Sequence, residues 1–213
     1  MSKTTDAYEA IKRLILSGEL LPLEELSEKD LQEKLEVSRT PIREAFQMLQ
    51  RESFLDIYPR KRIVVAPITI HLLEEVYDTR MILEPQFFKR ACGKIPDEKL
   101  LGLRSALLNP PDSLSGSEQS KYYNDLDSEL HSSVTPYINN HFLENVFRII
   151  QDHEIRIRNI LFNTQTNQAV IDEHLAIINA LLQRSESELE TQVIIHTENA
   201  RKKAFLHFFD HQI

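Results

Sequence analysis

The stretch VSRTPIREAFQML, Val37 to Leu49, decides how the front of the chain folds. Within this stretch, residues at helical spacing form two stripes. The apolar stripe consists of Ile42, Phe46 and Leu49. The polar stripe consists of Arg39, Arg43 and Gln47. Pro41 falls in the first turn, where a missing backbone N–H costs little. The pattern predicts an amphipathic helix with a basic outer face.

The residues on either side complete a recognisable arrangement. An apolar period over residues 4–17 predicts a helix that stops at Gly18, and Ser27 begins a second short helix that ends near Glu36. After the third helix, the β-prone runs FLDIY and RIVVA flank residues 59–61, which predicts a hairpin with a basic tip. Three helices followed by a hairpin predict a winged helix-turn-helix.

The polar groups of this region suit DNA. The hydroxyls of Ser38 and Thr40 lie at an expected helix N-terminus, where free backbone N–H groups can donate hydrogen bonds to a phosphate. An arginine can bridge the O6 and N7 edge of guanine. The expected wing adds Arg60, Lys61 and Arg62. The alternative is a solvated helix face with ordinary Ser/Thr capping.

From about Ile68 the periodicity is helical almost throughout. The expected helices cover residues 69–92, 96–108, 118–135, 140–163, 167–184 and 186–209. The predicted fold is therefore mainly α, with a winged helix-turn-helix domain over residues 1–68 and an all-α bundle of about six helices over residues 69–213.

Three histidines and an aspartate lie on expected inward faces of three helices in this bundle. Asp127 and His131 are four residues apart, His174 lies on an apolar stripe, and His196 follows Val193 by three. Imidazoles with a carboxylate suit a divalent metal: Zn²⁺ or Ni²⁺ first, with Mn²⁺ or Fe²⁺ as alternatives. Taken one at a time, the same histidines are also compatible with a hydrogen-bonded polar core.

Composition limits the class of protein. The net charge of −8 argues against a generic nucleic-acid binder, but residues 1–70 carry 11 Lys/Arg against 12 Asp/Glu, so the front domain is nearly neutral. The single Cys92 fits a reducing compartment, and we expect neither a signal peptide nor a membrane span. The expected location is the cytoplasm.

The segment LSEKDLQEKLEVSRTPIREAFQMLQRESFL, residues 26–55, resembles the DNA-binding region of GntR-family bacterial transcription regulators. Ser53 and Lys61 depart from the pattern, because the family usually carries glycine at both positions. The resemblance implies that the chain contacts operator DNA through Lys29, Ser38, Arg39, Thr40 and Arg43.

The segments DLDSELHSSV, IDEHLAIINAL and VIIHTENA resemble the FCD ligand-sensing domain of the FadR branch, in its shorter VanR-like form. The resemblance implies a divalent metal on Asp127, His131, His174 and His196, and a small carboxylate effector. It also places Arg80 in the effector cavity, although a salt bridge to Glu84 is the alternative. Asn140 and Arg156 are further effector candidates, with surface packing as their alternative.

These observations predict a metabolite-responsive transcription regulator that binds a palindromic operator as a homodimer. The alternative is a hydrolase-like metalloenzyme that uses the three histidines and the aspartate, although no H-E-x-x-H motif supplies a general base. A DNA-bundling protein is a third possibility, which would leave the buried polar residues unused.

Overall fold

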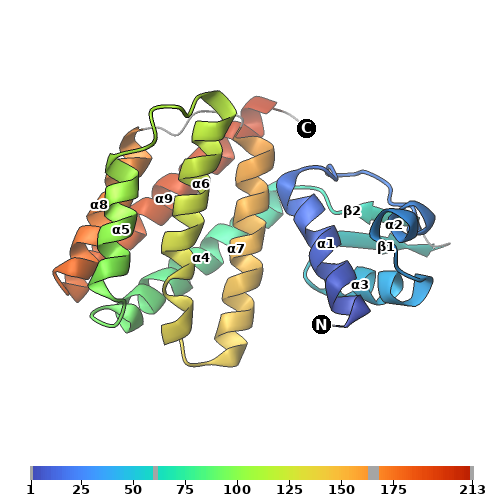
Figure 1. Ribbon diagram of the computed structural model, residues 1–213, viewed down its shortest axis with the longest axis horizontal. Helices are drawn as coiled ribbons and strands as arrows, with labels where there is room; N and C mark the ends of the chain where they lie inside the picture. Colours follow the sequence, from blue (N-terminus) through green and yellow to red (C-terminus); the bar gives the residue numbers. More distant parts are fainter. Residues whose placement is uncertain (1, 60–61, 163–167, 212–213) are drawn as a thin grey trace. The chain divides into compact units, whose positions relative to one another are not determined.

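The computed structural model describes residues 2–59, 62–162 and 168–211 (Figure 1). The chain forms two compact units. Unit 1 comprises residues 1–69 with 152–160, and unit 2 comprises residues 70–151 with 161–213. The sequence had assigned residues 152–160 to the helical domain, whereas in the structure they group with unit 1.

Unit 1 is a winged helix-turn-helix, as predicted. Its helices are α1 (Lys3–Ser17), α2 (Glu28–Leu35) and α3 (Arg39–Arg51), followed by the strands β1 (Leu55–Tyr58) and β2 (Arg62–Val65). The strands pair antiparallel, from Leu55 opposite Val65 to Tyr58 opposite Arg62. Arg60 and Lys61, the expected basic wing tip, lie outside the described residues.

The core of unit 1 forms where α1 packs on α3. Ile42, Phe46 and Leu49 are fully buried, so the apolar stripe of α3 faces this core and the polar stripe faces outward. The chain between α1 and α2 joins the hairpin, because the Leu26 N–H donates to the Ile63 carbonyl at 2.8 Å. The wing is therefore tied to the segment that leads into α2.

Ser53 explains why a glycine is usual at this position. It lies between α3 and β1 with φ of 62°, in the left-handed region that a glycine adopts without steric cost. Its N–H donates to the Gln50 carbonyl at 3.0 Å, and the next N–H donates to the Leu49 carbonyl at 2.9 Å. The turn that closes α3 therefore forms around a serine, at some conformational cost.

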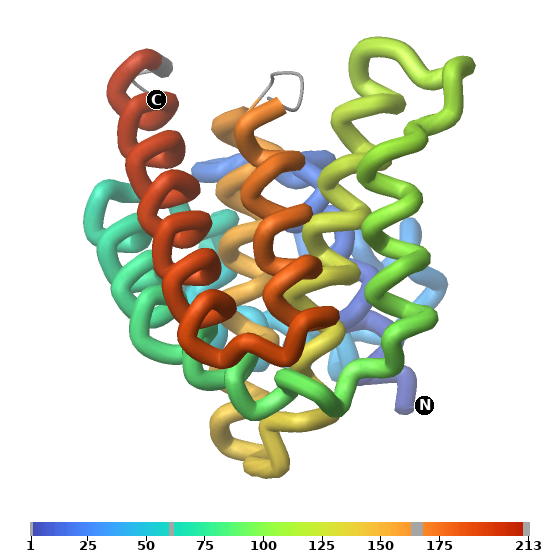
Figure 2. The backbone as a smooth tube through the Cα atoms, turned by 90° about the vertical axis from the view of Figure 1, so that its left-hand side faces the viewer, coloured from blue at the N-terminus to red at the C-terminus, as the bar shows by residue number. Residues whose placement is uncertain are grey.

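The described residues from Ile70 onward form six α-helices, which confirms the predicted bundle, and all of them belong to unit 2 except residues 152–160 of α7. They are α4 (Ile70–Ala91), α5 (Asp97–Leu108), α6 (Gly116–Ser132), α7 (His141–Leu161), α8 (Gln168–Leu182) and α9 (Glu186–His211), with a short 3₁₀ helix, η2 (Thr135–Tyr137), after α6. Helix α9 packs against both α4 and α8, and α8 runs beside it in Figure 2. None of the described helices is long and apolar enough to span a membrane.

Candidate metal centre and DNA-reading surface

The side chains expected to contact DNA lie on α2 and at the start of α3, in unit 1. All are exposed or half-buried: Lys29, Ser38, Arg39, Thr40, Arg43 and Gln47. Ser38 precedes α3 without a side-chain hydrogen bond to the helix. Its hydroxyl is therefore not used for capping, and it lies beside the free N–H groups of the first turn, where a phosphate would bind.

Glu28 on α2 joins the two arginines that the sequence singled out. Its two carboxylate oxygens each accept a hydrogen bond at 2.9 Å, one from Arg39 Nε and one from Arg43 Nε. The hydrogen bond from Arg43, with that from Arg39, holds the pKa of the Glu28 carboxyl below its usual range. Because these two hydrogen bonds use the Nε groups, the exposed guanidinium end of Arg39 keeps donors for another partner.

We expect Glu28→Gln to lower the preference for specific over random DNA by about 2- to 10-fold. Without the carboxylate that holds both arginines, ordering their side chains on DNA should cost about 0.5–1.5 kcal/mol more free energy. Affinity for random DNA should rise slightly, since one negative charge is removed. Gel-shift titrations of a selected duplex and a scrambled duplex at one salt concentration measure both effects. Asp30→Asn is the matched control, because Asp30 is an exposed α2 residue and the change also removes one negative charge. Equal changes on both duplexes would contradict the positioning role.

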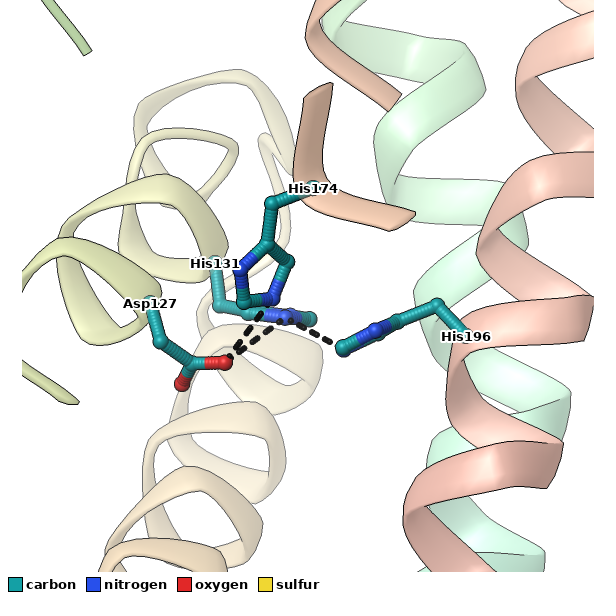
Figure 3. Close-up of side chains that lie close together, drawn as sticks. All are labelled: Asp127, His131, His174 and His196. Atoms are coloured by element: carbon teal, nitrogen blue, oxygen red, sulfur yellow. Dashed lines mark hydrogen bonds and ion pairs between the residues drawn. The ribbon is translucent and has the colours of Figure 1, made fainter. Parts of the chain in front are cut away.

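In unit 2 the structure brings the four predicted metal ligands together. Asp127 and His131 come from α6, His174 from α8 and His196 from α9, and their side chains converge in Figure 3. One ligand atom from each lies within 4.8 Å of all the others. We call Asp127, His131, His174 and His196 the His/Asp quartet. Its three imidazoles are buried and its carboxylate is nearly so.

The distances within the quartet fit a metal ion. His131 Nε2 lies 3.2 Å from His196 Nε2, and His174 Nε2 lies 3.0 Å from the nearer Asp127 oxygen, which is itself 3.9 Å from His131 Nε2. Bonds of about 2.0–2.1 Å from zinc to imidazole would place adjacent ligands of a tetrahedral ion about 3.3 Å apart. Three imidazole nitrogens and one carboxylate oxygen are also ligands that zinc, nickel, manganese and iron accept.

Behind His131 lies a buried ion pair. Glu84 Oε2 is 3.4 Å from His131 Nδ1, and Arg80 Nε donates to Glu84 Oε1 at 2.7 Å. Burial alone would raise the pKa of the Glu84 carboxyl, but Arg80 and His131 hold it well below its usual range. Burial conversely lowers the pKa of His131, and the Glu84 and Asp127 carboxylates more than offset this, so that the pKa is raised.

Behind His196 lies a second carboxylate. The Nδ1 atom of His196 is 3.0 Å from Glu173 Oε2, and the other Glu173 oxygen accepts a hydrogen bond from Asn199 Nδ2 at 2.7 Å. Burial lowers the pKa of His196 to about 4, against the opposing effect of Glu173. His196 is therefore a neutral imidazole at pH 7, which is the form that binds metals.

The three expected effector residues lie in different places. Arg80 is buried and forms the Glu84 salt bridge that was its alternative interpretation. Asn140 precedes α7, where its Oδ1 accepts from the N–H groups of Phe142 and Leu143. Arg156 is fully buried in unit 1 and donates through Nη2 to the Ala66 carbonyl, and burial lowers its pKa to about 10. The positions of Asn140 and Arg156 therefore give no support to an effector role.

Sequence reasoning did not identify three carboxylates as part of these sites. Glu28 and Glu173 were not singled out, and Glu84 was considered only as a partner of Arg80. Each of them acts on a residue of another helix, so local spacing carries no signal for the contact. Glu173 directly precedes His174 in the sequence, but this adjacency does not indicate that its carboxylate contacts His196.

Comparisons with known proteins agree with this geometry. Residues 3–65 match the family model of bacterial regulatory proteins of the gntR family, and residues 75–199 match the model of the FCD domain. The two matches define a DNA-binding transcription regulator, not an enzyme. The chain belongs to the gntR family, and its helical unit carries an FCD domain.

Relatives over most of the chain are regulators as well. The Nta operon transcriptional regulator of Aminobacter aminovorans is 29% identical over 187 residues, which cover 87% of this chain and 86% of that protein. The transcriptional repressor RspR of Escherichia coli is 22% identical, over 90% of this chain and 84% of that protein. The fold of Escherichia coli McbR/YncC is similar with a TM-score of 0.80 at 18% identity, and the match covers 98% of this chain and 99% of the other.

Proposed function

We propose that this regulator senses a small carboxylate metabolite through a divalent metal held by the His/Asp quartet. The observation that carries the proposal is the convergence of three buried imidazoles and one carboxylate from α6, α8 and α9. Burying four polar side chains is unfavourable unless they find partners, and a bound ion would satisfy all four at once. The proposed ion is Zn²⁺ or Ni²⁺, with Mn²⁺ or Fe²⁺ as alternatives.

The ion would supply positions at which an anionic oxygen can bind. The protein contributes the four ligands and the groups behind them. An effector carboxylate that also reached Arg80 would have to displace Glu84 from the guanidinium, to which it is bonded at 2.7 Å. That exchange would disturb the contact between Glu84 and His131. We therefore propose that effector binding alters the metal site through Arg80.

The DNA-binding half of the proposal assigns readout to the start of α3. Arg39 and Arg43 would contact base edges, Ser38 and Thr40 would contact phosphates, and Gln47 and Lys29 would flank them. Support comes from their exposure on one region of unit 1 and from the shared Glu28 contact. In a dimer, effector binding would alter DNA affinity by favouring one arrangement of the two copies of unit 1 over another.

We also propose that the protein acts as a homodimer on a palindromic operator, because one recognition helix contacts too few base pairs for useful specificity. Exposed apolar side chains of unit 2 are compatible with an interface. Phe142 and Val146, one turn apart on α7, are 70% and 43% exposed, and Ile82 on α4 is 69% exposed.

We expect the full-length protein to sediment as a dimer at micromolar concentration and to bind one dimer per palindromic duplex. Analytical ultracentrifugation of the protein alone and with labelled duplex gives both masses. Phe142→Glu, which places a charge on the exposed apolar face, should shift the equilibrium towards monomer if that face is used, with Glu144→Gln as the neighbouring control. A monodisperse wild-type monomer would contradict the dimer.

A further inference from the structure

Two of the quartet's imidazoles have a carboxylate near Nδ1, and that of His196 is hydrogen-bonded to it. The Nε2 atoms of His131 and His196 face each other at 3.2 Å, inside the quartet. Their Nδ1 atoms face away from it, His196 towards Glu173 at 3.0 Å and His131 towards Glu84 at 3.4 Å. Each ring thus lies between the proposed ion site and a carboxylate on a different helix.

The two carboxylates are themselves held in place. Asn199 donates to Glu173 from α9, the helix that also carries His196. Arg80 donates to Glu84 along α4, and the Thr197 hydroxyl, which donates to the Val193 carbonyl at 2.9 Å, lies 3.3 Å from the same carboxylate. Glu84 and Thr197 are almost fully buried. Helix α9 therefore supplies both the ligand His196 and the hydrogen bond from Asn199 that holds Glu173.

The chemistry of these contacts selects one form of the ring. A neutral imidazole carries a proton on one nitrogen and a lone pair on the other, and an ionised carboxylate only accepts hydrogen bonds. A carboxylate behind Nδ1 therefore keeps the proton there and leaves the lone pair on Nε2. Partners of this kind orient metal-binding histidines, and their loss costs about 10- to 100-fold in metal affinity.

We infer that Glu173 is a positioning residue that holds His196 with Nδ1 protonated and Nε2 directed at the ion. The inference rests on the proposed function, because it concerns the same metal site. It adds that the site has a second layer, in which the Glu173 carboxylate of α8 supports the α9 ligand His196.

The experiment measures Zn²⁺ affinity of chelator-stripped full-length protein, by competition with a chromophoric chelator. We expect Glu173→Ala to weaken Zn²⁺ binding about 10- to 100-fold and Glu173→Gln to weaken it less, because the amide oxygen still accepts one hydrogen bond. Asn199→Ala should give a smaller loss, since it frees Glu173 without removing it. Glu129→Gln, an exposed carboxylate on α6, is the matched control and should leave affinity unchanged.

Two further readouts separate positioning from general destabilisation. The melting temperature of the metal-free variants should match that of the wild type, because Glu173 is partly exposed. Long-range ¹H–¹⁵N spectra of the zinc-loaded wild type should show His196 protonated on Nδ1, and this signature should be lost in Glu173→Ala.

The outcomes distinguish the two claims. A wild type that binds no Zn²⁺ would overturn the metal site and the positioning role together. Normal Zn²⁺ binding by the wild type, its loss in His174→Ala and unchanged affinity in both Glu173→Ala and Asn199→Ala would overturn the positioning role alone. A metal-free Glu173→Ala that melts far below the wild type, with Asn199→Ala unchanged in affinity, would assign Glu173 to folding instead.

Discussion

Replacing Arg39 and Arg43 together with alanine is expected to abolish sequence-specific DNA binding while the protein stays folded. Their side chains are 59% and 39% exposed, and the Nε group of each donates a hydrogen bond to Glu28. Each well-formed arginine contact with a base edge is worth about 1–3 kcal/mol. Loss of both should therefore weaken specific binding by about 30-fold to more than 10,000-fold.

The measurement begins with a duplex selected by the wild-type protein from a random library. Gel-shift titrations then compare the wild type, the double variant and Arg51→Ala. Arg51 is an exposed arginine at the opposite end of α3, so it controls for the loss of a positive charge from the same helix. Circular dichroism checks that the helices remain. Full-strength binding by the double variant, with the fold intact, would exclude the start of α3 as the reading surface.

Replacing His174 with alanine is expected to remove the bound metal and the thermal stability that depends on it. The ion would join α6, α8 and α9, so it should bind the folded state far better than the unfolded chain. Free metal at 100 times its Kd adds about 2.7 kcal/mol. For a chain of this size, that stabilisation corresponds to an increase in Tm of about 5–10 °C. The variant should show neither the metal nor the shift.

Elemental analysis of purified wild type and His174→Ala measures the metal, and melting curves before and after chelation measure its contribution to stability. His71→Ala is the control, because His71 is an exposed histidine at the start of α4. Metal affinity should begin to fall as the pH drops through the raised pKa of His131, and should fall further towards pH 4, where the pKa of His196 lies, since protonated imidazole cannot bind a cation. Equal metal content in both proteins, or curves that ignore chelator and added metal, would show a hydrogen-bonded polar core instead.

The elements of the fold could be predicted because their signals are local. The apolar stripe of α3 repeats every three to four residues, and Ser27 caps α2 by accepting from the Asp30 N–H at 3.2 Å. The predicted helix over residues 118–135 ends at Ser132 in the structure, because Thr135–Tyr137, which contains Pro136, forms a 3₁₀ turn. Such differences concern the ends of elements, where the hydrophobic period is weakest.

The candidate metal site could be recognised in part for the same reason. Asp127 and His131 are spaced by one helical turn, and His174 lies on an apolar stripe, so both patterns direct the side chains inward. The supporting carboxylates could not be found in this way. Glu173 reaches a histidine 23 positions away on another helix, and a charged residue at that position also fits a solvated face.

By itself, the sequence determined the class of fold, the helix-turn-helix with its wing, and the candidate ligands on the inward faces of the bundle. Hydrophobic periodicity, helix caps and turns depend on residues three or four positions apart, so they can be recognised from the sequence alone. Only the tertiary structure decided that Glu28 bridges Arg39 and Arg43, that Glu84 and Glu173 lie behind His131 and His196, and that residues 152–160 group with unit 1. These contacts join distant segments, and they form only where the packing of buried side chains brings particular helices together.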